Sequence, residues 1–258
     1  MPDKLRAIHT GMDLGQMPRK ERIFLSAEWR DLAILNYEAD PRLLDRYIPS
    51  GTALDYFQGK TYVSLVGFRF YHTRLFGFLL IPFHANFIEV NLRFYVCRRE
   101  GSEIRRGVVF IAEIVPRRAV AIAARLLYGE NYVHLPMKHS VLEGESGKTA
   151  EYQWRLNGRW CKLAVQAHGI PATPAQGSLE QFIAEHYWGY SPRRNGCGLE
   201  YHVSHQPWAI WTNTEAQFEG DAGALYGAEL GKILCRPPDS AFLAIGSPVI
   251  VHKGEGIH

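Results

Sequence analysis

Residues 86–96, NFIEVNLRFYV, alternate apolar and polar side chains, and this stretch guides the interpretation of the whole chain. Successive side chains of a β-strand point to opposite sides, so one face of the predicted strand carries only apolar residues. The opposite face carries Glu89, Asn91, Arg93 and Tyr95, which are an acid, an amide, a base and a phenol in one row. Such a row is either the solvated face of an antiparallel sheet or the lining of a polar cavity.

Length and composition are typical of a globular chain with a sizeable core. The chain has 258 residues, 47% hydrophobic and 21% charged, with a formal net charge of +3. Arginines occur in short pairs spread along the chain, so we expect no nucleic-acid partner. The longest apolar run, residues 75–83, is far too short to span a bilayer, and residues 1–22 lack the apolar region of a secretory signal. We therefore expect no membrane association and a cytoplasmic location.

The cysteines and histidines predict no metal site. The four cysteines form no CxxC pair, which argues against a zinc ribbon or a disulfide framework and fits reduced thiols. His202 and His205 lie three residues apart on a predicted strand, so their side chains would point to opposite faces. The chain also lacks a phosphate-binding loop and a dinucleotide fingerprint. We expect neither a metal nor another cofactor.

Long alternating strands with few helices and no βαβ rhythm indicate a mainly antiparallel, β-dominated α+β fold. Strands are predicted over residues 29–37, 61–70, 86–98, 107–115, 149–156, 159–168, 198–205 and 241–252. Helices are predicted over residues 40–47, 117–128, 179–188 and 222–233. We divide the chain into a loosely attached arm over 1–22, a single domain over 23–252 and a tail over 253–258.

Two local patterns define element boundaries. Asn157-Gly158 separates two strand patterns and predicts a two-residue hairpin turn, because both central residues of a type I′ turn need positive φ. Ser178, with Gln181 three residues later, forms a capping-box pattern at the start of the helix predicted over 179–188.

Five segments of the chain form a recognisable series. They are WRDLAILNYEADPRLLDRYIPSG, FIEVNLRFYV, GVVFIAEIVPRRAVAIAARLLYG, FIAEHYWGY and HVSHQPW. In this order they resemble the YqjF-like proteins, an uncharacterised branch similar to the acetoacetate decarboxylase superfamily. The resemblance spans roughly residues 24–210. It implies one domain built on a closed, cone-like antiparallel β-barrel with a few peripheral helices and an internal cavity.

In acetoacetate decarboxylase, a cavity lysine forms a Schiff base with the keto acid and a second lysine lowers its pKa. This lysine pair does not carry over: counting on from Arg125, the matching positions hold Tyr132 and Val133. A Schiff base needs a neutral amine, which neither side chain has. Lys138 would need a slip of about six residues to reach the pocket. A decarboxylase-like lyase that uses Lys138 is therefore only a second alternative.

The resemblance also suggests ligand-binding groups. Arg30 matches the family's pocket arginine, and a bidentate pair with a substrate carboxylate would suit it. Its alternative is a salt bridge with Asp31 or Glu28. Glu89 matches a family glutamate, and in a small barrel one face of every strand points inward. Because unpaired buried charge is costly, Glu89 and Arg93 would then be paired or would bind something. The alternative is a structural ion pair on a solvated face.

The sequence thus predicts an anionic, oxo-acid-like small-molecule partner that is bound or transformed without a lysine imine. Glu89, Tyr132 and His134 are the catalytic candidates, with the tyrosine as acid or hydrogen-bond donor and the histidine as base. The ligand-binding candidates are Arg30, Asn91, Arg93 and Tyr95. A core tyrosine with a satisfied hydroxyl is the alternative for Tyr132. The alternative for the whole protein is a non-catalytic ligand-binding or interaction module, and a homo-oligomer is compatible with both.

Overall fold

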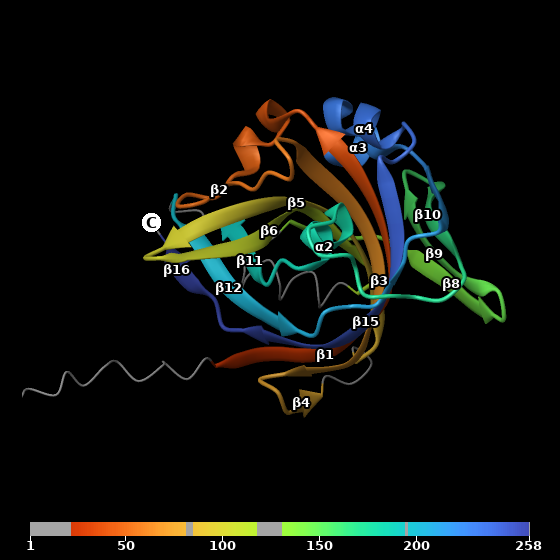
Figure 1. Cartoon of the computed structure of the whole chain (residues 1–258), viewed down its shortest axis with the longest axis horizontal. Helices are drawn as coiled ribbons and strands as arrows, with labels where there is room; N and C mark the ends of the chain where they lie inside the picture. The colour runs from red at the N-terminus through yellow and green to blue at the C-terminus, as the bar shows by residue number, and fades with distance from the viewer. Residues whose placement is uncertain (1–21, 81–84, 118–130, 194–195, 258) are drawn as a thin grey trace, which may run out of the picture.

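Two β-sheets dominate the computed structural model, which describes residues 22–80, 85–117, 131–193 and 196–257 (Figure 1). The larger sheet contains β1 (Ile23–Ala39), β2 (Ala53–Leu54), β3 (Thr61–Leu75), β4 (Leu79–Leu80), β5 (Phe87–Glu100), β6 (Glu103–Val115), β7 (Tyr132–His134), β11 (Trp188–Pro192), β12 (Gly198–His205), β13 (Ile210–Trp211), β15 (Ser240–His252) and β16 (Glu255–Ile257). The smaller sheet contains β8 (Met137–Gly144), β9 (Gly147–Leu156), β10 (Arg159–His168) and β14 (Thr214–Glu219). The described helices are the 3-10 helices η1 (Pro41–Leu43) and η2 (Asp45–Tyr47), and the α-helices α2 (Leu179–Ala184), α3 (Ala222–Tyr226) and α4 (Ala228–Leu234).

The larger sheet is ordered β13-β15-β1-β3-β5-β6-β11-β12-β16, and β12 also pairs with β15. Its described pairs are antiparallel except where β6 meets β11 and β7. The prediction of a mainly antiparallel, β-dominated fold is therefore confirmed.

The two faces of the larger sheet pack against different partners. On one face, Leu92 belongs to a buried cluster with Trp154 of the smaller sheet. On the other face, Tyr95 belongs to a buried cluster with Phe182 of α2. Figure 1 shows α2 within the curve of the larger sheet and the smaller sheet outside it. We call the face that packs against the smaller sheet the outer face, and the face that packs against α2 the inner face. The resemblance predicts peripheral helices, whereas α2 lies on the inner face because its apolar side chains are buried there.

The helices are shorter than their sequence patterns predict. Ser178 Oγ accepts a hydrogen bond from the Gln181 amide at 3.2 Å, as the capping pattern predicts, but α2 ends at Ala184. The chain then enters β11, whose pairing with β6 and β12 takes precedence over helix continuation. Gly227, at φ 87°, divides the helix predicted over 222–233 into α3 and α4. The helix predicted over 117–128 falls outside the described residues beyond position 117, as do residues 1–21 of the arm.

The last described residues contribute to the sheet. Residues 253–258 are assigned to a tail by the sequence, but β16 pairs with β12 through the partners Ile257 and Gly198. The Ile257 side chain is buried in the outer-face cluster. This apolar contact fixes the position of residues that carry no strand pattern of their own.

The Asn157-Gly158 turn forms as predicted. Asn157 has φ 48° and Gly158 has φ 81°, and Leu156 of β9 pairs directly with Arg159 of β10. Two residues with positive φ between directly paired strand ends are characteristic of a type I′ hairpin.

We expect Gly158→Val to lower the free energy of unfolding by about 1 kcal/mol or more, because a β-branched residue is strained at this φ. A Cβ atom at Gly158 would meet nothing within 4 Å, so the loss would come from the backbone alone. Gly144→Val is the matched control, since Gly144 has the same open surroundings without a φ in the left-handed range. Urea unfolding measures both variants. Equal stability of the two would contradict the turn assignment.

Candidate functional site

The polar row of β5 lies on the inner face of the larger sheet. Glu89 pairs across the sheet with Phe68, a member of the inner-face cluster. The exposed fractions are 2% for Glu89, 2% for Asn91, 8% for Arg93 and 1% for Tyr95. The row is therefore interior and is not a solvated face.

Two carboxylates, an amide and a phenol gather at one end of the row. Asn91 Nδ2 donates to Glu89 Oε1 at 2.9 Å, and the Tyr132 hydroxyl donates to Glu89 Oε2 at 3.4 Å. Glu113 pairs in register with Asn91 on one side and with Tyr132 on the other, and it is 1% exposed. His134 is partly buried and lies two residues beyond Tyr132 on β7, hence on the same strand face.

Sequence reasoning passed over Glu113. It is the one charged residue in GVVFIAEIV, residues 107–115, which predicts a buried central strand. A single acid inside such a run is the signal that was available, because a fully buried carboxylate is rare unless it is paired.

Arg93 occupies the other half of the row. Its Nη2 donates to the Ile183 carbonyl of α2 at 3.3 Å, and its guanidinium lies 5.7 Å from the centre of the Tyr95 ring. Among the described residues no carboxylate lies within ion-pair distance of Arg93, and its Nε is buried without a hydrogen-bond acceptor. A buried cation with no acid beside it has a high desolvation cost, and a bound anion would offset this cost.

The Tyr95 hydroxyl belongs to a buried hydrogen-bond chain. Ser64 Oγ donates to Asn36 Oδ1 at 2.6 Å, and Asn36 Nδ2 donates to Ser240 Oγ at 3.0 Å. The Ser64 hydroxyl has one proton, so Tyr95, whose oxygen lies 2.6 Å away, is the donor to Ser64. These hydrogen bonds connect β5, β3, β1 and β15. The Tyr95 hydroxyl proton is therefore engaged in a structural hydrogen bond.

A buried histidine lies beside the row. His186 Nε2 is 3.2 Å from Asp55 Oδ2, and the His186 ring centre is 4.8 Å from that of Tyr95. Burial lowers the pKa of His186, and the opposing hydrogen bond to Asp55 does not cancel this effect. The imidazole is thus held neutral next to Arg93.

Arg30 lies apart from these residues, on the outer face. It pairs in register with Arg69, which in turn pairs with Ile88 of the outer-face cluster. Its guanidinium forms an ion pair with Glu28, the alternative that the sequence offers for this arginine. A bulge follows at Asp31, whose φ is 55°. The structure thus separates Arg30 from Glu89, which the resemblance would place around one cavity.

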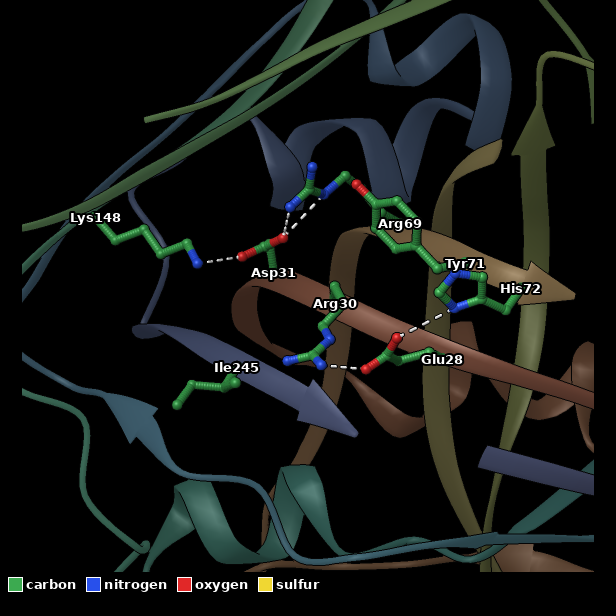
Figure 2. Close-up of a pocket in the computed structure, with 8 residues that line it drawn as sticks. All are labelled: Glu28, Arg30, Asp31, Arg69, Tyr71, His72, Lys148 and Ile245. Carbon is green, nitrogen blue, oxygen red and sulfur yellow. Dashed lines mark hydrogen bonds and ion pairs between the residues drawn. The ribbon is translucent and has the colours of Figure 1, made fainter. Parts of the chain in front are cut away.

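Arg30 borders a pocket of about 310 Å³ on the outer face, which we call the bulge pocket (Figure 2). Its lining residues are Glu28, Arg30, Asp31, Arg69, Tyr71, His72, Lys148 and Ile245. Asp31 is the central acid: Arg69 Nε lies 2.9 Å from Oδ2 and Lys148 Nζ lies 2.6 Å from Oδ1. Lys148 comes from β9, so this carboxylate links the two sheets.

Two features are absent from the part of the chain that the structure describes. No helix in the ranges given above is long and apolar enough to cross a membrane. No group of three or more His, Cys, Asp or Glu side chains within those ranges is arranged to hold a metal ion.

Comparison with known proteins places the chain in a family. Residues 26–249 match DUF2071, described as an uncharacterized conserved protein family. The chain belongs to this family. The uncharacterized protein YqjF of Bacillus subtilis is 26% identical over 193 residues, which cover 73% of this chain and 75% of YqjF. The YqjF-like resemblance seen in the sequence is thereby confirmed.

Solved structures show the same fold. Acetoacetate decarboxylase from Legionella pneumophila superposes with a TM-score of 0.64 at 13% identity, covering 100% of this chain and 98% of that one. The enduracididine biosynthesis enzyme MppR complexed with pyruvate gives 0.62 at 13% identity, covering 95% and 93%. An acetoacetate decarboxylase-like enzyme from Sphingomonas wittichii gives 0.63 at 12% identity, covering 91% and 93%. These likenesses show that the chain shares the fold of these acetoacetate decarboxylase-like proteins.

The lowered pKa of His186 makes stability depend on pH. In the unfolded chain this histidine binds a proton at about pH 6.5, whereas in the folded protein it does so only at lower pH. Its contribution to the free energy of unfolding is therefore fully present above about pH 6.5 and is lost as the pH drops below that value. We expect His186→Gln to flatten the dependence of the free energy of unfolding on pH between about pH 7 and pH 5. The wild type, measured in the same buffers, is the reference. Urea unfolding across this range measures the slopes, and an unchanged slope in His186→Gln would refute the assignment.

Proposed function

We propose that the inner polar row binds a small organic anion of the oxo-acid type without forming a lysine imine. The observation that carries this proposal is Arg93, a buried guanidinium with no carboxylate partner among the described residues. The proposal includes a closed, cone-like barrel with an internal cavity at the row. Pairing of β12 with β15 supports closure, because it returns the order of strands to β15.

The row supplies complementary groups for such a ligand. Arg93 would hold the carboxylate, since its planar fork matches a carboxylate better than a point charge does. Tyr132 would donate to the oxo group, and Glu89 beside it would accept or return a proton. Asn91 Oδ1, buried without a donor among the described residues, would accept a hydrogen bond from the ligand. His134 would serve as a secondary base.

The positions of the described lysines support chemistry without an imine. Lys138 is exposed on β8, with its ammonium 4.5 Å from the centre of the Trp160 ring. Among the described lysines that form ion pairs, Lys148 has the least exposed side chain. It lines the bulge pocket and not the inner polar row. Burial lowers the pKa of Lys148, yet hydrogen bonds to Asp31 and Glu143 outweigh burial and raise it overall. A protonated ammonium is not a nucleophile.

The solved relatives are consistent with this ligand class. MppR has been crystallised with pyruvate and with the condensation product of pyruvate and imidazole 4-carboxaldehyde. In that protein, therefore, the shared fold accommodates a 2-oxo acid. We extend the ligand class to this chain on the basis of Arg93 and its polar neighbours.

Calorimetric titration with pyruvate, acetoacetate and 2-oxoglutarate tests the proposal. We expect saturable binding that weakens by about tenfold or more in Arg93→Gln, because charge-assisted hydrogen bonds are lost. Arg159→Gln, at an exposed arginine of the β9–β10 hairpin, should bind like the wild type. Equal affinity of Arg93→Gln and wild type would remove Arg93 from the site. Absence of binding by every oxo acid would favour the interaction module.

Borohydride trapping tests the absence of an imine. After incubation with acetoacetate and borohydride, we expect the intact mass to stay unchanged, because Lys138 is exposed on the smaller sheet and Lys148 is charged. Peptide mapping would locate any adduct, with Lys138→Ala as the matched variant. An adduct on Lys138 together with decarboxylation that disappears in this variant would restore the lyase assignment.

A further inference from the structure

We infer that the bulge pocket is a second anion site, which takes a small organic carboxylate across Arg30 and Arg69. This site is separate from the inner polar row, because the two lie on opposite faces of the larger sheet. Its lining residues come from β1, β3, β9 and β15, whereas the row lies on β5.

The local backbone of β1 is built around this pocket. Asp31 is a buried, non-glycine residue at φ 55°, a conformation that L-residues rarely adopt. It is held there by the Tyr152 hydroxyl, which donates to the Asp31 carbonyl at 2.7 Å, and by its ion pairs with Arg69 and Lys148. A bulge re-aims side chains, and this one places Arg30 and Asp31 on the same face. Residues held in such a rarely adopted backbone conformation are frequent at functional sites.

The two facing arginines of the pocket favour an anion. Arg30 and Arg69 stand directly opposite each other on neighbouring strands, where like charges repel. The lining contains three permanent cations and two carboxylates, and the third cation, Lys148, also pairs with Glu143 just outside the lining. An anion lying over the two guanidinium groups would offset the repulsion between them.

Donors remain available for this anion. Arg30 uses Nη2 for Glu28, and Arg69 uses Nε and Nη2 for Asp31. The Nη1 groups of both arginines have no acceptor within the described ranges, and the Arg30 side chain is 42% exposed. Figure 2 shows the Arg30 guanidinium between Glu28 and the side of the pocket formed by Ile245. A ligand can therefore approach Arg30 without displacing the buried ion pairs of Asp31.

The shape and charge of the pocket select the ligand class. A volume of about 310 Å³ suits a small organic molecule. Guanidinium groups bind carboxylates and phosphates with the same fork geometry. Because each cation of the pocket already has a carboxylate partner, a carboxylate with one negative charge fits better than a phosphate dianion. Ile245 offers an apolar surface for the hydrocarbon part.

Methyl NMR of the isoleucine-labelled full chain tests this inference with butyrate as the probe. Ile245 lines the pocket, so its δ1-methyl signal, assigned through Ile245→Val, should shift and saturate with butyrate. We expect the dissociation constant from this signal to rise about tenfold in Arg30→Gln. Arg42→Gln is the matched control: Arg42 also pairs with an acid two residues earlier, Asp40, but does not border the pocket. It should behave like the wild type.

The outcomes separate this inference from the proposed inner site. Arg93→Gln should leave the response of Ile245 unchanged, since Arg93 lies on the other face. If the Ile245 methyl signal does not shift at tens of millimolar butyrate, or if Arg30→Gln and the wild type bind butyrate with equal affinity, the second site is overturned. A tighter response to inorganic phosphate than to butyrate would overturn the carboxylate assignment.

Discussion

The structure depends on the burial of β5 on both of its faces. Its apolar side chains pack against the smaller sheet, while the α2 helix and the inner-face cluster cover the polar ones. A strand that is amphipathic in sequence is thus enclosed as if it were apolar throughout. Every charged or polar group of the row must then find a partner within the protein or in a ligand, because burial removes its water.

Some side chains of the row have protein partners that explain their burial, whereas Arg93 lacks an acidic partner, and this difference indicates a ligand-binding role. Glu89 and Tyr95 have protein partners at hydrogen-bond distance, so their burial is explained by the fold. Arg93 has one backbone carbonyl for a full positive charge. A merely structural row would be expected to include an acid for this guanidinium, since an uncompensated buried charge is strongly destabilising. The anion proposed above would supply that missing negative charge.

Sequence periodicity predicted the strands because the alternation of β5 and the turn chemistry of Asn157-Gly158 are local properties. It overestimated the α2 helix, since the pairing of β11 is a long-range interaction that no local pattern encodes. It also missed Glu113 and His186, whose neighbours in space are distant in sequence. The polar row could be listed residue by residue from the sequence, but the contacts that distinguish Arg93 from Glu89 depend on tertiary structure.

Arg30 illustrates how one residue can change the assignment of a site. Leu32 faces the inner cluster, so a regular strand would place Arg30, two residues earlier, on the same inner face. The extra residue of the bulge at Asp31 reverses this alternation and turns Arg30 outward, because a slip by one residue exchanges the two faces of a strand. The ion pairs of Asp31 with Arg69 and Lys148 stabilise the slip and also join the two sheets. The same buried carboxylate therefore fixes the packing of the smaller sheet and keeps Arg30 away from the inner row, which leaves Arg93 as the cation of that row.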